Sequence, residues 1–299
     1  MTPRNTPSLC FIGFGEAGQA LASGLREAGV HSIAAWDILL PEREGERLKA
    51  AGAKIGVRLA TSAADAVRGS DMIVSAVTAA SSLTAAQQVK PHLSGQVFLD
   101  INSVSAGRKR ETARELAAAA RYVDVAVMAP VHPARHQTPM LLAGPEAEAV
   151  APVLQELTMK VAVAGPQIGA AEAIKMVRSV MVKGMEALTY ECFVAAARAG
   201  VEDQVIASLA KSFPTLDWSR LIEYNLERMA SHGARRAAEM EEVADTLREL
   251  GIEPLMATAT AERQREMGRL GRNDNVRGTF KQGRTAMLTA ISAAARDGH

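Results

Sequence analysis

The chain has 299 residues, of which 48% are hydrophobic and 22% charged, and its formal net charge is +1. This length suits two hydrophobic cores, and the near-zero charge gives no electrostatic reason to expect nucleic acid or a membrane as a partner. No uncharged run approaches the ~20 residues of a membrane span, and the N-terminus lacks the apolar core of a signal peptide. Only two cysteines occur, Cys10 and Cys192. We therefore expect a cytoplasmic protein without disulfides or a metal site.

The first half of the chain alternates short apolar runs with helical patterns. Strands are expected at 9–12, 32–36, 72–76, 97–100, 122–125, 140–142 and 160–163. Helices are expected near 19–28, 42–51, 63–68, 82–90, 106–120 and 146–156. Repeated alternation of strand and helix predicts an α/β fold with a doubly wound, mostly parallel sheet. The later strands leave room for an antiparallel edge.

The β pattern ends near residue 165. Helices are expected at 170–199, 202–212, 216–231, 233–250, 253–268 and 276–295. We therefore predict two domains, residues 1–165 with the sheet and residues 166–299 all-helical. A helix of ~30 residues spans roughly 45 Å, which predicts that the first of these helices joins the domains. Ligands of open α/β sheets bind at the carboxyl ends of the strands, so the active cleft is expected between those ends and the helical domain.

A glycine motif, Gly13-x-Gly15-x-x-Gly18, follows the first strand and opens the first helix. Gly13 permits the tight turn, Gly15 lets a pyrophosphate approach the backbone, and Gly18 lets the helix lie close to the strand. The helix start offers unpaired N–H groups and a positive dipole end to phosphates. An ordinary strand-to-helix turn is the alternative. The preceding strand, the following helix and an acid about 20 residues on favour a dinucleotide-binding Rossmann domain.

The acid is Asp37, at the end of the second strand. A carboxylate there would accept hydrogen bonds from both ribose hydroxyls of adenosine and repel a 2′-phosphate, which favours NAD. Arg43 lies close enough in sequence to leave NADP open as an alternative. Val77 and Thr78 follow a central strand and should lie along the nucleotide. The predicted cofactor-binding residues are Gly13, Phe14, Gly15, Glu16, Ala17, Gly18, Asp37, Val77 and Thr78.

Polar side chains leave the strand that ends at Asp100, in the segment Asp100–Ser105. Asn102 and Ser103 could orient a substrate carboxylate or hydroxyl. Ser103 or Ser105 could instead cap the following helix, and the spacing leaves both roles open. The loop 128–136 offers His132, Arg135 and His136 for an anionic substrate, with a solvated surface loop as the alternative, which we favour for His136.

Lys175 and Ser179 lie on one face of the long helix. A partly desolvated lysine amine can take a hydroxyl proton while hydride leaves the same carbon, and its ammonium form can return the proton to a carbonyl oxygen. The alternative is a surface lysine paired with Glu172, and Lys183 is a rival on nearly the same face. We expect Lys175 to be the catalytic residue and Ser179 to contact substrate.

The glycine motif, Asp100–Ser105, the segment from Asp124 to Gly144 and Lys175 occur in the order of the β-hydroxyacid dehydrogenase family, which the chain resembles over nearly its whole length. That family includes 3-hydroxyisobutyrate, tartronate semialdehyde and 6-phosphogluconate dehydrogenases. The resemblance implies that the lysine is the general acid/base and that Asn102 and Ser103 stand in the substrate-binding motif. It also points to a homodimer, as do the long Ala- and Met-rich helices.

The departures from the family pattern leave the substrate open. The usual Ser-Gly-Gly is replaced by Met128-Ala129-Pro130, the usual Asn after the lysine is Ser179, and a C-terminal Lys-Asp pair reads Ala238-Glu239. This combination resembles the branch with a DUF1932-type C-terminal domain. We expect an NAD(P)-dependent dehydrogenase of a small hydroxy acid. Alternatives are an oxidative decarboxylase, an imine reductase (relatives of that type usually carry Asp or Tyr at the lysine position) and a non-catalytic NAD-binding protein.

Overall fold

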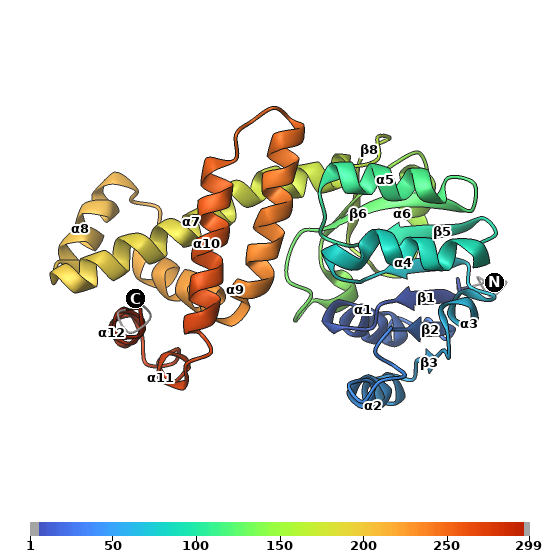
Figure 1. Cartoon of the computed structure of the whole chain (residues 1–299), viewed down its shortest axis with the longest axis horizontal. Coiled ribbons are helices and arrows are strands. Elements are labelled where there is room, and N and C mark those ends of the chain that lie inside the picture. Colours follow the sequence, from blue (N-terminus) through green and yellow to red (C-terminus); the bar gives the residue numbers. More distant parts are fainter. Residues whose placement is uncertain (1–5, 296–299) are drawn as a thin grey trace. The chain divides into compact units, whose positions relative to one another are not determined.

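The computed structural model describes residues 6–295. These form two compact units, the first ending at Met176 and the second beginning at Val177 (Figure 1). The division falls inside helix α7 (Ala170–Ala199), later than the predicted boundary at residue 165. The reason is local: Ala171 of this helix packs with Ala126 and Ala143 of the sheet, so the first two turns of α7 belong to the first unit.

The first unit contains one eight-stranded sheet in the order β3-β2-β1-β4-β5-β6-β7-β8. The strands are β1 (Leu9–Ile12), β2 (Ile33–Trp36), β3 (Arg58–Leu59), β4 (Met72–Ser75), β5 (Gln96–Asp100), β6 (Ala120–Val127), β7 (Met140–Ala143) and β8 (Val161–Gly165). Every neighbouring pair is parallel except β6 with β7. This confirms the doubly wound, mostly parallel sheet. The two-residue strand β3 was not predicted, because a run this short has no readable period.

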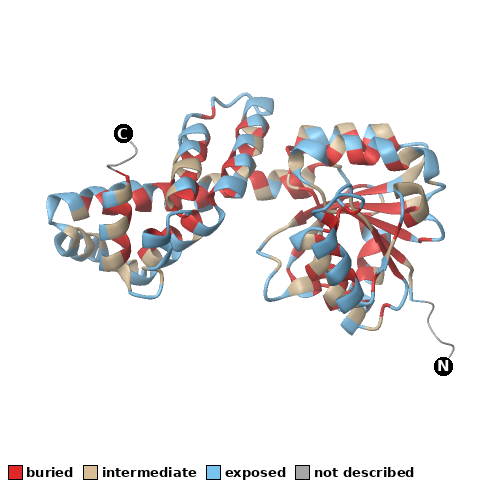
Figure 2. Cartoon of the chain, turned by 60° about the horizontal axis from the view of Figure 1, so that its bottom comes forward, coloured by how far each residue is buried: buried red, intermediate tan, exposed pale blue. Residues whose placement is uncertain are grey.

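Six helices cover the two faces of the sheet: α1 (Glu16–Glu27), α2 (Gly45–Ile55), α3 (Ala63–Val67), α4 (Ser82–Val89), α5 (Ala106–Leu116) and α6 (Ala147–Glu156). Side chains alternate across the strands, so Leu9 and Phe11 pack on the face of α1, α2 and α6. Cys10 and Ile12 pack on the opposite face with α3, α4 and α5. Figure 2 shows the strands buried and the outer faces of these helices exposed.

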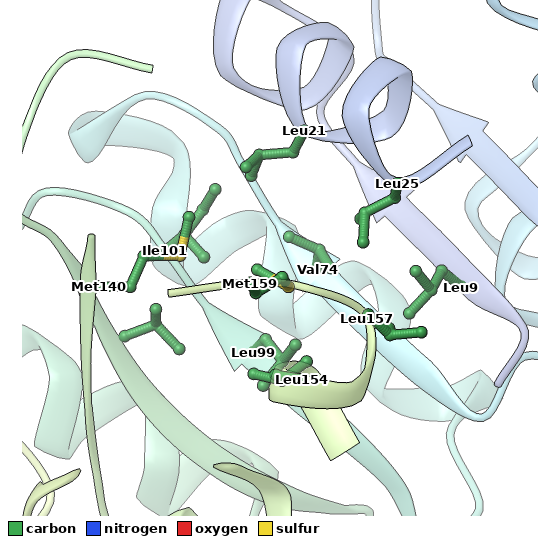
Figure 3. A pocket seen from close by; sticks show the side chains of 11 residues that line it. Leu9, Leu21, Leu25, Val74, Leu99, Ile101, Met140, Leu154, Leu157 and Met159 are labelled. Carbon is green, nitrogen blue, oxygen red and sulfur yellow. The ribbon is translucent and has the colours of Figure 1, made fainter. Parts of the chain in front are cut away.

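One small cavity of about 20 Å³ lies in the core between the sheet and α1 (Figure 3). All of its lining side chains are apolar: Leu9, Leu21, Leu25, Val74, Leu99, Ile101, Val125, Met140, Leu154, Leu157 and Met159. A water needs polar partners, so such walls keep the cavity dry. It is a packing defect without chemistry, and the functional groups gather instead at the carboxyl edge of the sheet.

The second unit holds the rest of α7 and helices α8 (Glu202–Ser212), α9 (Trp218–Glu249), α10 (Leu255–Leu270), α11 (Asp274–Arg277) and α12 (Arg284–Ala294). Its core includes Phe193, Ile222 and Leu288. Two predictions were wrong here. The predicted helix 276–295 is divided into α11 and α12, with Gly283 at a positive φ of 89° between them. The predicted break between 231 and 233 does not exist, because α9 is continuous.

Gly233 is a site of close helix packing within α9. A Cβ at this position would lie 2.2 Å from the carbonyl oxygen of Gln264 in α10, and one at Gly268 would lie 2.7 Å from the Ala234 nitrogen. The backbones of α9 and α10 therefore touch at this crossing. A glycine in a helical pattern signals either a break or such an approach, and only the structure distinguishes them.

We expect Gly233→Ala to lower the free energy of unfolding by about 1–3 kcal/mol or more, because the added methyl group forces the helices apart. Gly184→Ala is the matched control. The nearest atom to its added Cβ is Thr260 Oγ1 at 3.9 Å, so the gain in helix propensity should stabilise the protein by about 0.5–1 kcal/mol. Urea unfolding of both variants checks this, and equal effects would contradict the packing argument.

Candidate active site

The glycine turn joins β1 to α1 at the carboxyl edge of the sheet. Gly13 has a φ of +92°, and a Cβ there would lie 2.4 Å from the carbonyl oxygen of Ala76, just beyond β4. A Cβ on Gly18 would lie 2.6 Å from the Gly13 oxygen. Both glycines are thus required by the protein's own packing, one for the turn and one for the close approach of helix and strand.

Gly15 is different, because nothing in the fold requires it. Among residues 6–295, and apart from Gly15 and its two chain neighbours, no heavy atom lies within 4 Å of the point where its Cβ would be. Gly15 is the N-cap of α1 and has no side chain to cap the helix, so the first N–H groups of the helix have no partner within it. A phosphate in the open space could accept hydrogen bonds from those N–H groups. The turn therefore fits a dinucleotide.

Asp37 follows β2 and lies half-buried beside the turn. Its Oδ2 accepts a hydrogen bond of 2.7 Å from the Phe14 nitrogen, and its Oδ1 accepts one of 3.0 Å from the Leu39 nitrogen. These bonds fix the carboxylate next to the glycine turn. Each oxygen keeps a lone pair that can accept from a ribose hydroxyl.

Asn102 ties the ends of β4 and β5 together. Its Oδ1 accepts a 2.7 Å hydrogen bond from the Val77 nitrogen, and its Nδ2 donates to Ser75 and Ser82 hydroxyls at 2.9 and 3.3 Å. The side chain is only 2% exposed and both amide hydrogens are used. Asn102 therefore positions the Val77 backbone. Thr78, the next residue, is exposed at the same edge.

The two serines of this segment divide the roles that the sequence left open. Ser105 is the N-cap of α5, and its hydroxyl accepts from the Arg108 nitrogen at 3.2 Å. Ser103 takes no part in that cap, and its hydroxyl accepts a short hydrogen bond from Lys175 Nζ. The Ser103 hydroxyl hydrogen can therefore point to another acceptor.

Lys175 lies in the first two turns of α7, and its side chain is 12% exposed. It does pair with Glu172, at 3.1 Å between Nζ and Oε1, as the structural alternative proposed. That pair is not on the surface, because Glu172 is completely buried. The amine is therefore held mainly out of water, with Ser103 on one side and a buried carboxyl on the other.

Behind this pair lies a buried ionic cluster that sequence reasoning missed. Lys109 of α5 is fully buried and lies 3.2 Å from Asp100 Oδ1, 3.5 Å from Asp124 Oδ1 and 3.9 Å from Glu172 Oε2. Its Nζ also donates to the Asp100 carbonyl oxygen at 2.6 Å. In the sequence, Lys109 stands between two arginines, Arg108 and Arg110. The signal that could have found it is helical spacing, since Ala113 and Leu116 share its buried face.

Charges in the cluster shift the pKa values of its members. Burial lowers the pKa of Lys109, but the three carboxylates together outweigh burial and raise it. Burial raises the pKa of Asp124, against the Lys109 charge. Burial also raises the pKa of Glu172 to about 7, although Lys175 and Lys109 act against the rise. The cluster therefore holds a carboxyl that can exchange a proton near neutral pH.

The rival lysine and Ser179 lie beyond Met176, in the second unit. Lys183 Nζ donates to the Ser179 hydroxyl at 3.1 Å and pairs with Glu239 Oε2 at 3.1 Å. Lys183 thus has its own carboxylate partner. The contact of Ser179 with substrate stays a prediction.

The loop before β7 packs against the far end of α1. Arg135 donates to Glu27 Oε2 at 2.6 Å, and His136 Nε2 lies 2.8 Å from the Thr158 hydroxyl. Gly24 makes room for the His136 ring, since a Cβ there would lie 2.1 Å from Nδ1. These contacts favour a packing role over substrate binding for both residues. The expectation of a solvated loop was wrong for His136, which is buried against α1.

Within residues 6–295, every helix is too short or too polar to span a lipid bilayer. In the same range, no group of three or more His, Cys, Asp or Glu side chains is arranged to hold a metal ion.

Two family models match the chain. Residues 8–104 match "NADP oxidoreductase coenzyme F420-dependent", and residues 196–267 match the domain of unknown function DUF1932. A solved conserved hypothetical protein from Sinorhizobium meliloti is 34% identical, with a TM-score of 0.77 and 97% of each chain covered. A second solved protein, of unknown function but described as similar to 3-hydroxyacid dehydrogenases, is 31% identical with a TM-score of 0.71. The match covers 89% of this chain and 98% of that protein's chain.

The fold is shared with 3-hydroxyisobutyrate dehydrogenase of Mycobacterium tuberculosis, which is 17% identical with a TM-score of 0.73 over 97% of this chain and 99% of that one. The family model over residues 8–104 and the 31% identical solved protein support an NAD(P)-dependent oxidoreductase at the level of reaction class. The chain belongs to the β-hydroxyacid dehydrogenase family, in the branch that carries the DUF1932 domain.

Proposed function

We propose that the protein is an NAD-preferring dehydrogenase of a small hydroxy acid, with Lys175 as its general acid/base. The observation that carries the proposal is the contact between Lys175 Nζ and Ser103 at the carboxyl edge of β5. β5 neighbours β4, and β4 neighbours β1, so this edge also carries the glycine turn. An amine with restricted access to water and a nucleotide cradle therefore lie on one edge.

The cofactor would be held by the glycine turn from Gly13 to Gly18, by Asp37 and by Val77 and Thr78. The open space at Gly15 takes the pyrophosphate, and the Asp37 carboxylate accepts from the ribose hydroxyls. A 2′-phosphate would meet that negative charge, which supports NAD over NADP. When bound, the nicotinamide ring supplies or accepts the hydride.

Lys175 moves the proton. In the oxidising direction its neutral amine takes the hydroxyl proton of the substrate, and in the reducing direction its ammonium group gives that proton back to the carbonyl oxygen. Ser103 accepts a hydrogen bond from Lys175 and can donate its own hydrogen to a substrate oxygen. Asn102 acts on substrate indirectly, by holding Val77. Ser179 is proposed as a further substrate contact.

We also infer a cytoplasmic homodimer. Met181 and Leu188 of α7 are 66% and 59% exposed, which supports a partner surface on this helix. A monomeric mass in light scattering would contradict the dimer.

Gly15→Ala tests the cofactor site. We expect only a small loss of thermal stability, because no neighbouring part of the fold meets the new Cβ and alanine is merely a poorer N-cap than glycine. NAD affinity should be at least about tenfold weaker, or about 1.4 kcal/mol. Isothermal titration with NAD and NADP measures both the loss and the preference. Gly13→Ala is the matched control, and it should lose stability as well as affinity because its φ is positive. Unchanged NAD affinity in Gly15→Ala would contradict the proposed site.

A further inference from the structure

We propose that Glu172 is the proton-exchange partner of Lys175, a positioning residue that sets when the lysine carries its proton. The inference rests on the proposed role of Lys175 and extends it into the buried cluster behind it. Glu172 Oε1 lies 3.1 Å from Lys175 Nζ on the same helix, and Glu172 Oε2 lies 3.9 Å from Lys109 Nζ of α5. Asp124 of β6 also contacts this residue, because its Oδ2 accepts a hydrogen bond of 3.3 Å from the Glu172 backbone nitrogen.

The charges of the cluster do not balance when every member is ionised. Lys109 and Lys175 supply two positive charges, whereas Asp100, Asp124 and Glu172 supply three negative ones. All three carboxyl side chains are completely buried, where an uncompensated charge is costly. One additional proton on a carboxyl makes the cluster neutral.

Hydrogen bonds indicate which carboxyl takes that proton. Asp100 accepts from the Tyr122 hydroxyl at 2.7 Å and from the Asn102 nitrogen at 3.0 Å, so both of its carboxyl oxygens already accept hydrogen bonds. Asp124 accepts from the backbone nitrogens of Gly169 and Glu172. Glu172 has no such bond from a backbone nitrogen among the described contacts, and its pKa is raised to about 7 by burial. Glu172 is therefore the member of the cluster that exchanges a proton.

The proton step balances in both directions. In reduction, Lys175 gives its proton to the substrate carbonyl oxygen and becomes a neutral amine. The Glu172 O–H bond then breaks, a new N–H bond forms on Lys175, and the carboxylate is left behind. The ammonium then returns a proton to Glu172 and takes one from solvent, because the amine is the partly exposed member of the pair. Oxidation runs the same steps in reverse: the pair first loses one proton to solvent, the Glu172 carboxylate takes a proton from the Lys175 ammonium, and the neutral amine then takes the hydroxyl proton of the substrate.

Carbon-13 NMR of the full chain, labelled at the glutamate carboxyl carbons, tests the pairing without any substrate. The Glu172 signal is assigned as the one missing from Glu172→Gln, or as the one missing from Glu172→Asp should the first variant not fold. We expect this signal to titrate near neutral pH. In Lys175→Met its midpoint should rise by roughly one pH unit or more, because a cation within 4 Å is lost. Lys183→Met is the matched control and should leave the midpoint unchanged.

Titration of Glu172 in the ordinary range of a glutamate, or a midpoint that Lys175→Met does not move, would overturn the proposal. Turnover separates it from the proposed function. If Lys175→Met abolishes turnover while Glu172→Gln leaves the pH midpoint of turnover in place, Glu172 is excluded and the dehydrogenase mechanism stands. If Lys175→Met keeps full turnover, the role of Lys175 fails, whatever the NMR shows, and the proton exchange has no catalytic purpose.

Discussion

Lys175→Met is expected to lower kcat/KM for the hydroxy acid substrate by about 10²–10⁴-fold while leaving NAD affinity unchanged. Methionine keeps the length and apolar stem of the side chain but cannot accept or donate the proton. The glycine turn and Asp37 are held by their own contacts, which do not include Lys175. Steady-state kinetics with a panel that includes 3-hydroxyisobutyrate and L-serine, together with NAD titration, measures both quantities.

Lys183→Met is the control for this result. Lys183 pairs with Glu239 in the second unit, so its loss should change turnover far less than the loss of Lys175. A larger loss of turnover in Lys183→Met than in Lys175→Met would identify the rival lysine as the proton carrier.

Lys109→Met is expected to lower the free energy of unfolding by about 3–5 kcal/mol, because it leaves three buried carboxyls with one ammonium partner. Lys90→Met removes a lysine of a half-exposed pair with Glu115 and should cost no more than about 1 kcal/mol. Urea unfolding of both variants gives the comparison. Equal effects would show that the buried cluster is not held together by Lys109.

The pH dependence of that result has a definite sign. The folded-state pKa of Glu172, about 7, lies above the ordinary value of 4.5, so its favourable contribution is complete below pH 4.5 and is lost as the pH rises through 7. Without Lys109 the ionised carboxyls are less compensated. The deficit of Lys109→Met should therefore grow between pH 5 and pH 8. A deficit that shrinks over this range would contradict the account of the cluster.

Local patterns predicted most of the first unit and its glycine turn. Each glycine of the motif has a separate physical reason that can be read from sequence: a turn, a phosphate approach and a helix contact. In the structure, neighbouring protein atoms leave no room for a side chain at Gly13 or Gly18, which accounts for the turn and the helix contact. At Gly15 there is open space, which leaves room for a phosphate. The spacing around Ser103 and Ser105 allowed either to cap α5, because both precede the same helix start. Side-chain positions alone decide that Ser105 caps and Ser103 faces Lys175.

Long-range charge placement was beyond the sequence. Lys109, Asp124 and Glu172 come from three separate elements, and only the sheet order brings them together. The same holds for Gly233, whose role depends on a second glycine, Gly268, on another helix. A pattern read along one chain segment shows which face of an element is buried. It does not show which charged side chain, or which backbone segment, packs against that face.

The most direct test of the mechanism is a crystal structure of the protein with NAD and the hydroxy acid that the substrate panel identifies. We expect Lys175 Nζ within hydrogen-bond reach, about 2.6–3.2 Å, of the hydroxyl oxygen on the carbon that faces the nicotinamide ring. We also expect the pyrophosphate against Gly15. A substrate hydroxyl bound to another side chain, with Lys175 still turned to Ser103 and away from the reacting carbon, would contradict the proposed mechanism.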